Sequence, residues 1–178
     1  MNVNIINIGD ELLIGQVTNT NATWMAQQLT AIGCAVTDIV CIADRREAIE
    51  GSLRRCMQQA DAVLVTGGLG PTKDDITKKT LCDFFHSRLV EDEASLRNIE
   101  RLFAGRGYPM TETNRQQALV PACCKVIVNE TGTAPCMWFE YQGNIIVSMP
   151  GVPSEMKFLM EKSIIPSLQE RNADHCIV

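Results

Sequence analysis

Short apolar runs alternate with longer segments of helical periodicity in the first half of the chain. Residues 3–8, 35–42 and 61–66 form the apolar runs and predict three strands. Residues 21–32 carry apolar side chains every three to four positions, and a similar pattern follows Asp44, which predicts two helices. The run DAVLVT at residues 61–66 is apolar almost throughout, which is typical of a strand covered on both faces in a parallel sheet.

In the second half of the chain, apolar runs and helical segments alternate less regularly. Its predicted elements are helices over residues 74–85, 91–105 and 154–165, a short helical piece at 114–119, and strands at 125–128, 136–141 and 144–149. Gln142 and Gly143 separate the last two strands as a hairpin turn would. We interpret residues 106–135, with their three prolines, as irregular, and the residues after Pro166 as a helix end and tail.

Strands that alternate with helices at this spacing favour a parallel sheet, because each crossover connection has to pack back onto the sheet. We therefore predict a three-layer α/β fold, with a mixed, mainly parallel sheet and helices on both of its faces. The chain of 178 residues fits a single core, and no repeat or linker divides it. We assign residues 1–168 to one domain and residues 169–178 to a C-terminal tail.

Composition and charge exclude several classes of protein. The chain has 16 Lys plus Arg against 21 Asp plus Glu and a net charge of −5, and its basic residues are scattered, so we expect no nucleic-acid partner. The eight cysteines include no C-x-x-C pair, and only two histidines accompany them, which argues against a zinc site. No apolar run reaches the roughly 18 residues of a membrane span. We expect a cytoplasmic protein without a membrane partner.

The loop after the third predicted strand is the most informative segment for function. It reads TGGLGPTKDDIT over residues 66–77. Gly67, Gly68 and Gly70 free the backbone to bring N–H groups against a ligand, and the following helix adds its positive end, which suits a phosphate. The spacing matches neither a Walker A loop nor the dinucleotide fingerprint G-x-G-x-x-G. A turn with capping aspartates is the structural alternative.

Carboxylates collect at the predicted carboxyl edge of the sheet, where open α/β folds bind their ligands. Asp10 and Glu11 follow the first strand, Asp44 follows the second, and Asp74 and Asp75 lie beside the glycine loop. These carboxylates would repel a phosphate unless a divalent cation lies between them, since Mg²⁺ takes oxygen ligands from both. One carboxylate could also activate water. Helix capping would explain Asp44 and Asp74, so we favour Asp75 as the functional residue.

Other polar residues are weaker candidates. Arg115 could contact a phosphate, although a solvated surface charge is the commoner role of such a residue. Ser154 follows PGVP, where a helix cap is its default role. The positions of His86 and His175 give no Ser-His-Asp arrangement, which excludes covalent serine chemistry.

Five motifs stand out along residues 1–168: IGDELLIGQVTNTN, TGGLGPTKDDIT, NRQQALVP, NETGTAP and PGVPSEM. Together they resemble the N-terminal domain of the competence/damage-inducible CinA family. That domain is similar to the molybdopterin-binding fold of MogA and MoeA, in which the corresponding loop is TGGTG followed by Arg-Asp-x-Thr. Here Leu69 replaces the first threonine and Asp74 the arginine, whereas Asp75 and Thr77 keep their positions. The resemblance implies a MogA-like fold, and the two substitutions favour a ligand other than a pterin.

The resemblance implies a divalent-metal-dependent pyrophosphatase that splits ADP-ribose or a related nucleotide into AMP and a sugar phosphate, with Mg²⁺, Mn²⁺ or Co²⁺ as the metal. In this assignment the catalytic residues are Asp75, Asp44 and Glu11, and the metal ligands are Asp10, Asp44 and Asp75. The residues expected to contact the ligand are Gly9, Asp10, Gly67, Gly68, Leu69, Gly70, Pro71, Thr72, Thr77, Arg115, Pro150 and Gly151.

Two alternative functions stay open at this point. The domain could bind a molybdopterin-like or nucleotide ligand without turnover, or it could be a regulatory or assembly domain whose pocket is idle. The related folds also imply a homo-oligomer. Many family members carry a C-terminal domain that deamidates nicotinamide mononucleotide. The sequence stops at Val178, before any such domain, so we expect either a short form or part of a longer protein and assign no deamidase activity.

Overall fold

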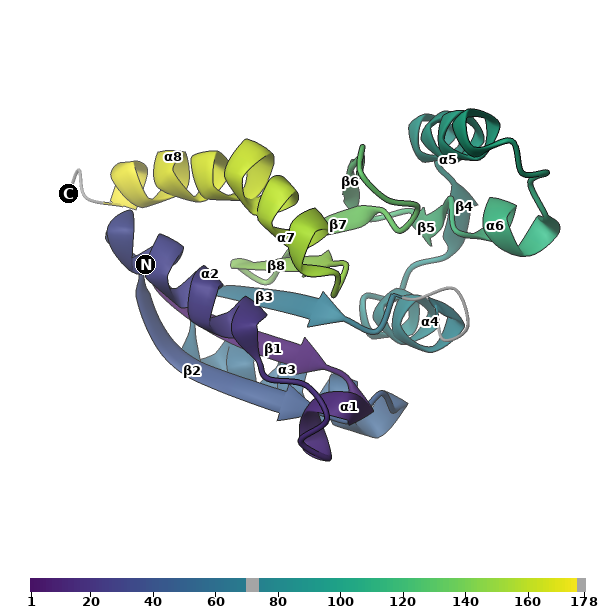
Figure 1. Cartoon of the computed structure of the whole chain (residues 1–178). Coiled ribbons are helices and arrows are strands. Elements are labelled where there is room, and N and C mark those ends of the chain that lie inside the picture. Colours follow the sequence, from purple (N-terminus) through teal and green to yellow (C-terminus); the bar gives the residue numbers. More distant parts are fainter. Residues whose placement is uncertain (70–73, 176–178) are drawn as a thin grey trace.

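A computed structural model describes the backbone of residues 1–69 and 74–175 and the side chains of residues 1–69 and 76–173. Its centre is a six-stranded sheet with the strand order β2-β1-β3-β8-β7-β6 (Figure 1). The strands of this sheet are β1 Asn2–Ile8, β2 Ala35–Ile42, β3 Ala62–Gly67, β6 Lys125–Ile127, β7 Cys136–Tyr141 and β8 Asn144–Met149. β2, β1, β3 and β8 are parallel, whereas β7 and β6 pair antiparallel. The prediction of a mixed, mainly parallel sheet is confirmed.

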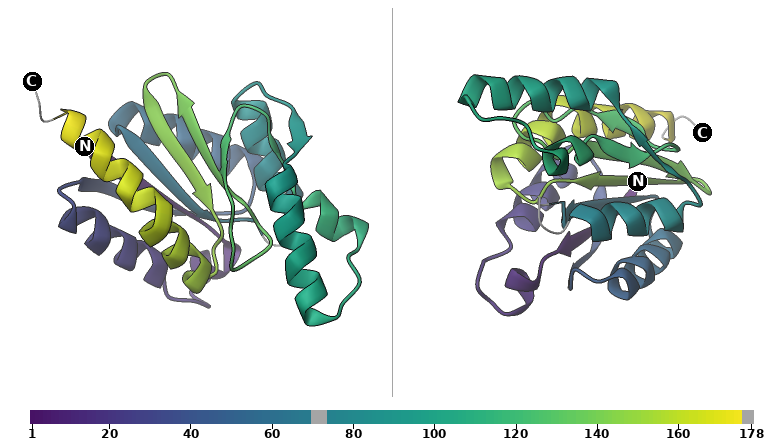
Figure 2. Two further views of the ribbon diagram at one scale, coloured as in Figure 1. Left: turned by 90° about the horizontal axis from the view of Figure 1, so that it is seen from above. Right: turned by 90° about the vertical axis from the view of Figure 1, so that its right-hand side faces the viewer.

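Helices cover both faces of this sheet (Figure 2). One face carries α2 Thr20–Ala31 and the C-terminal run of α7 Pro153–Leu159, η1 Met160–Ile164 and α8 Ile165–His175, and the other carries α3 Arg46–Gln59 and α4 Asp74–Phe84. Alternation along β1 explains the two layers, because Ile5 packs with α2 and α7 while its neighbour Ile6 packs with α3 and α4. The three-layer α/β prediction is confirmed. Among the described residues, no helix is long and apolar enough to cross a membrane.

A small outer unit lies beyond α4 (Figure 1). It consists of β4 Leu89–Glu91, α5 Glu93–Arg106, α6 Glu112–Gln116 and β5 Leu119–Pro121, and β4 pairs antiparallel with β5. The periodicity of the sequence predicted α5 and a short helical piece near α6. It did not predict the two strands, because each has only three residues and their pairing joins segments far apart in the chain.

Two predicted helix caps are wrong. Helix α3 begins at Arg46 with Arg45 as its N-cap residue, so Asp44 lies one position too early to cap it. Helix α7 begins at Pro153, which places Ser154 inside the first turn rather than at the cap position. Capping therefore does not explain Asp44.

The C-terminal helix extends further than the sequence predicted. Pro166 was expected to end it, yet α8 continues to His175. The π turn of η1 ends two residues before this proline, and its wider turn provides space for a ring that would clash with the carbonyl four residues earlier in an ordinary helix. Leu168, in the first turn of α8, is fully buried in the core cluster, and Oδ1 of Asn172 further along accepts a hydrogen bond from the N-terminal amine of Met1 at 3.0 Å.

Thiol reactivity should follow burial in this fold. Among the described cysteines, Cys41 and Cys123 are exposed and Cys136 is buried. Burial raises the pKa of the Cys124 thiol to about 12 and also raises the pKa of Cys136. Because the thiolate is the nucleophile, alkylation at mildly alkaline pH should label Cys41 and Cys123 before the other cysteines that the structure describes. Peptide mass spectrometry checks this order. Fast labelling of Cys136 in the native protein would contradict the packing.

Candidate functional site

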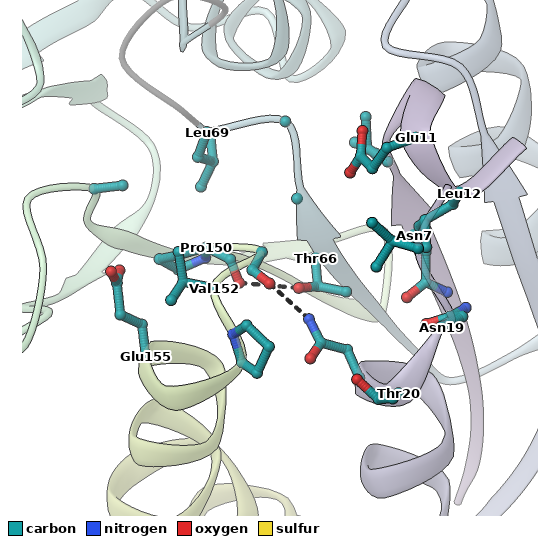
Figure 3. Close-up of a pocket in the computed structure, with 18 of the residues that line it drawn as sticks. Asn7, Glu11, Leu12, Asn19, Thr20, Thr66, Leu69, Pro150, Val152 and Glu155 are labelled. Atoms are coloured by element: carbon teal, nitrogen blue, oxygen red, sulfur yellow. Dashed lines mark hydrogen bonds between the residues drawn. The ribbon is translucent and has the colours of Figure 1, made fainter. Parts of the chain in front are cut away.

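An open cavity of about 370 Å³ lies at the carboxyl edge of the sheet, where β1, β3 and β8 end (Figure 3). Strand β1 stands between β2 and β3, so the chain places its second and third strands on opposite sides of the first. Such a change of direction opens a crevice at the carboxyl ends of the strands, which is the usual ligand site of open α/β sheets. The cavity therefore occupies the position that the fold favours for a ligand.

Bare glycine backbone forms the floor of the cavity. Gly67 ends β3 and Gly68 follows it, with φ angles of 96° and 71°, a region that residues with side chains disfavour. A β-carbon on Gly67 would overlap the carbonyl oxygen of Ile8, and one on Gly68 would overlap the hydroxyl of Thr77. Gly151 lies against them, since a β-carbon there would stand 3.1 Å from the Gly67 Cα. A ligand can therefore approach the main chain directly.

Hydrogen bonds from side chains of β3 and α2 hold this floor in place. The Thr66 hydroxyl donates to the carbonyl oxygen of Pro150 at 2.9 Å, and the side-chain amide of Asn21 donates to the carbonyl oxygen of Gly151 at 2.8 Å (Figure 3). Asn19 caps α2 by accepting a backbone N–H at 3.1 Å, and both asparagines line the cavity. The positive N-terminal end of a 12-residue helix therefore opens onto the site.

Carboxylates stand at two opposite sides of the cavity (Figure 3). Glu11 is exposed in the short helix α1 Asp10–Leu13, and its carboxylate lies over Gly9, where a β-carbon would overlap it. Glu155 is half-buried in the first turn of α7. The described part of the lining contains no Lys or Arg. The cavity thus has a neutral floor between two acidic sides.

Asp10 and Asp44 adjoin each other at the ends of β1 and β2. The backbone N–H of Asp44 donates to Oδ1 of Asp10 at 3.2 Å, and Asp44 is 8% exposed. Neither residue lines the cavity itself. Among the side chains that the structure describes, no three His, Cys, Asp or Glu gather as a metal site. Two of the three predicted metal ligands are therefore neighbours, and the side chain of the third, Asp75, lies outside the described residues.

The catalytic candidate Glu11 and the predicted ligand residues other than Asp10 fall into four groups. Those that line the cavity are Glu11, Gly67, Gly68, Leu69, Pro150 and Gly151. Gly9 and Thr77 adjoin it, because they contact Glu11 and Gly68 respectively. Arg115 does not line it, and its guanidinium donates two hydrogen bonds to Glu91 at 3.0 and 3.2 Å. Gly70, Pro71 and Thr72 lie outside the described residues.

Several lining residues were not singled out from the sequence: Asn7, Thr66, Asn19, Thr20, Asn21, Thr133, Ala134 and Glu155. All but Asn7 stand inside motifs that carried the family resemblance, so the motifs held a usable signal. Asn7 is a polar residue, 1% exposed, within the apolar run of β1. Its Nδ2 donates to the carbonyl oxygen of Val40, while its Oδ1 has no hydrogen-bond partner among the described residues. A buried amide of this kind indicates a place for a water or a ligand group.

The chain matches known proteins over nearly its whole length. The family model described as "Probable molybdopterin binding domain" matches residues 4–170. A CinA-like protein of Flavobacterium psychrophilum is 44% identical over 169 residues, and one of Cytophaga hutchinsonii is 44% identical over 167 residues. Each alignment covers 94% of this chain and 40% of the relative. The chain therefore spans about two fifths of the length of these relatives.

Solved structures give the same result at the level of the fold. MoaB of Thermus thermophilus, described as a molybdopterin biosynthesis enzyme, is 20% identical with a TM-score of 0.61, covering 94% of this chain and 91% of its own, which shows a shared fold. CinA of Thermoplasma acidophilum, described as a protein of unknown function, is 32% identical with a TM-score of 0.81. That alignment covers 90% of this chain and 94% of the archaeal one. This chain therefore belongs to the CinA family, within the wider family of probable molybdopterin binding domains.

Proposed function

We propose that the cavity binds a nucleotide that contains a diphosphate, such as ADP-ribose, and that the protein hydrolyses this diphosphate with the help of a divalent metal ion. The observation that carries the proposal is the bare floor of Gly67, Gly68 and Gly151 at the switch point of the sheet. Backbone N–H groups at such a floor suit phosphate oxygens, and the volume falls within the roughly 300–1,000 Å³ of small-molecule sites.

A divalent cation would balance the negative charge of a diphosphate in this cavity. A diphosphate between Glu11 and Glu155, with no Lys or Arg in the described lining, needs a positive charge beyond that of the α2 N-terminus. Mg²⁺ is typically held by one or two carboxylates, substrate phosphates and waters, so the neighbouring pair Asp10 and Asp44 would hold it, with Asp75 as the expected third ligand. When bound, such an ion neutralises phosphate charge and makes water more acidic.

The residues of the chain itself would bind and orient the diphosphate. The main chain of Gly67 and Gly68 would contact the diphosphate. Thr66 and Asn21 donate hydrogen bonds to the carbonyl oxygens of the loop after β8, and these bonds fix that loop beside the two glycines. Glu11 is the candidate base, because its carboxylate lines the cavity and can accept a proton from water. Water adds to one phosphorus, and the bridging oxygen leaves with the other, which yields AMP and a sugar phosphate.

Binding without turnover is the second candidate function. The family description and the shared fold of a molybdopterin biosynthesis enzyme favour it. Leu69 favours the nucleotide over the pterin, because it places a buried apolar side chain, 3% exposed, in the cavity wall. A pterin ring offers many polar edges that such a wall leaves without partners.

Metal-dependent release of AMP tests the proposal directly. We expect AMP from ADP-ribose with Mg²⁺, Mn²⁺ or Co²⁺, no AMP with a chelator, and a loss of roughly 10²-fold or more in Asp75→Asn and Asp44→Asn. Chromatography of the nucleotides measures this. The matched control is Asp83→Asn, which removes an exposed carboxylate that pairs with Arg46 outside the cavity and should keep full activity.

The same assay separates the two candidate functions. ADP-ribose that binds in calorimetry but yields no AMP with any of the three metals would select the binding module. Neither binding nor turnover would overturn both. Full activity of Asp75→Asn would remove the catalytic assignment while leaving the ligand in place.

A further inference from the structure

The segment 129–134 that walls one side of the cavity is held by a complete set of hydrogen bonds. Asn129 is 1% exposed, and its Nδ2 donates to the carbonyl oxygen of Ala134 at 3.0 Å and to Oε2 of Glu155 at 2.7 Å. Its Oδ1 accepts from the backbone N–H and the hydroxyl of Thr131 at 3.2 and 3.0 Å. Both amide protons and the carbonyl oxygen of this side chain are therefore engaged, which fixes its orientation.

Helix α5 also holds the segment 129–134 through hydrogen bonds. The side-chain amide of Asn98 donates to the carbonyl oxygens of Asn129 and Gly132 at 2.7 and 3.2 Å. Gly132 lies directly against Glu155, because a β-carbon on it would overlap the Glu155 carboxylate. The Glu155 carboxylate therefore lies between a glycine and the fixed amide of Asn129.

Glu155 lines the cavity, and one of its carboxylate oxygens has no hydrogen-bond donor among the described residues. It lines the wall opposite Glu11 (Figure 3) and is half-buried. Within the described residues its Oε2 accepts from Asn129, while its Oε1 accepts no hydrogen bond and neither oxygen forms an ion pair. A carboxylate without a neighbouring cation repels a phosphate group. Because an ionised carboxylate only accepts hydrogen bonds, Glu155 suits hydrogen-bond donors on the ligand.

We infer that Glu155 is a specificity-determining residue that accepts hydrogen bonds from the vicinal hydroxyls of a ribose, and that Asn129 is the positioning residue that orients it. This inference rests on the proposed function, because a diphosphate over the glycine floor carries a sugar toward each side of the cavity. A carboxylate placed beside the phosphate site is how dinucleotide-binding folds select a ribose 2′-hydroxyl, and it excludes a phosphate on that hydroxyl by charge. The chemistry is the same for either ribose of ADP-ribose.

Ligands with altered sugars test the inference. One series carries 2′-deoxyribose or a 2′-phosphate on the adenosine side, and the other carries 2-deoxyribose in place of the distal ribose. We expect wild-type protein with its metal to prefer the natural ligand by roughly 10- to 100-fold in one of the two series, since a hydrogen bond to a charged group is lost. The series that shows the preference identifies the ribose. Calorimetry measures affinity, and steady-state kinetics separates KM from kcat.

Two variants tie the preference to Glu155. Glu155→Gln keeps the shape but removes the charge, so the preference should fall to near unity through KM, and the 2′-phosphate ligand should bind better than it does to wild type if the adenosine ribose occupies this side. If Glu155 only supported the structure of the wall, Glu155→Gln would not bind the 2′-phosphate ligand better than wild type. Glu130→Gln is the matched control, because Glu130 lies in the same segment but pairs with Lys162 outside the cavity.

The outcomes separate this inference from the proposed function. Equal affinity of the wild-type protein for natural and altered sugars in both series overturns the role of Glu155 alone. An unchanged preference in a folded Glu155→Gln variant overturns it too. Wild-type protein that neither binds nor hydrolyses any ligand of the set overturns the proposed function and this inference with it.

Discussion

Replacement of Gly67 by alanine should destabilise the protein and abolish ligand binding at the same time. Gly67 has a φ of 96°, and a left-handed backbone costs a residue with a β-carbon about 1–2 kcal/mol. The added carbon would also overlap the carbonyl oxygen of Ile8, its partner in the β1–β3 ladder, which cannot withdraw without breaking the pairing. Overpacking of this kind typically adds about 1–3 kcal/mol. We therefore expect a loss of about 2–5 kcal/mol in the free energy of unfolding.

Urea unfolding and calorimetric titration with ADP-ribose measure the two effects of Gly67→Ala. Gly51→Ala is the matched control, because Gly51 is exposed within α3 and a β-carbon there meets open space. Alanine in a helix interior is favoured over glycine by about 0.5–1 kcal/mol, so this variant should gain stability and keep its affinity. An unfolding free energy of Gly67→Ala close to that of wild type would show that the floor is not built as described.

Local patterns in the sequence were sufficient to predict the sheet and the edge at which the cavity lies. The continuous apolar run before Gly67 predicted a doubly covered strand, and β3 is buried from Ala62 to Thr66. Glycine followed by glycine after such a run predicted an exposed main chain, because only that residue adopts positive φ without cost. The carboxyl ends of parallel strands then had to meet at one edge, which is where Glu11, Gly67 and Pro150 line a common cavity.

Local sequence patterns could not predict contacts between residues that lie far apart in the chain. Glu155 looked like an ordinary helical residue after PGVP, and its contacts with Asn129 and Gly132 appear only when α7 packs against the segment before β7. Asp44 resembled a helix cap because the exact start of a helix depends on backbone geometry that the sequence does not reveal. Arg115 resembled a phosphate ligand until the fold placed Glu91 beside it. The surroundings of Glu155 and Arg115 are therefore set by residues from other elements of the fold.

Replacement of Asn129 by alanine should produce the second large effect. The change removes four hydrogen bonds and leaves Oε2 of Glu155, the carbonyl oxygen of Ala134 and the N–H of Thr131 without their partner. Unsatisfied buried groups cost about 1–3 kcal/mol each, and water reaches part of this wall, so we expect a total loss of about 2–4 kcal/mol in the free energy of unfolding. Asn114→Ala is the matched control, because its side chain completes a surface capping box in α6 worth only about 1 kcal/mol.

A double-mutant cycle between Asn129→Ala and Glu155→Gln then separates stability from recognition. If Asn129 acts on the ligand by orienting Glu155, the two changes in affinity for the natural ligand should not add, and the double variant should bind about as weakly as the weaker single variant. The coupling should appear in KM, because Glu155 faces the sugar, Asn129 acts through Glu155, and neither residue contacts the reacting phosphorus. Additive losses in affinity would mean that Asn129 supports the cavity wall in general, and that Glu155 keeps its orientation through Gly132 alone.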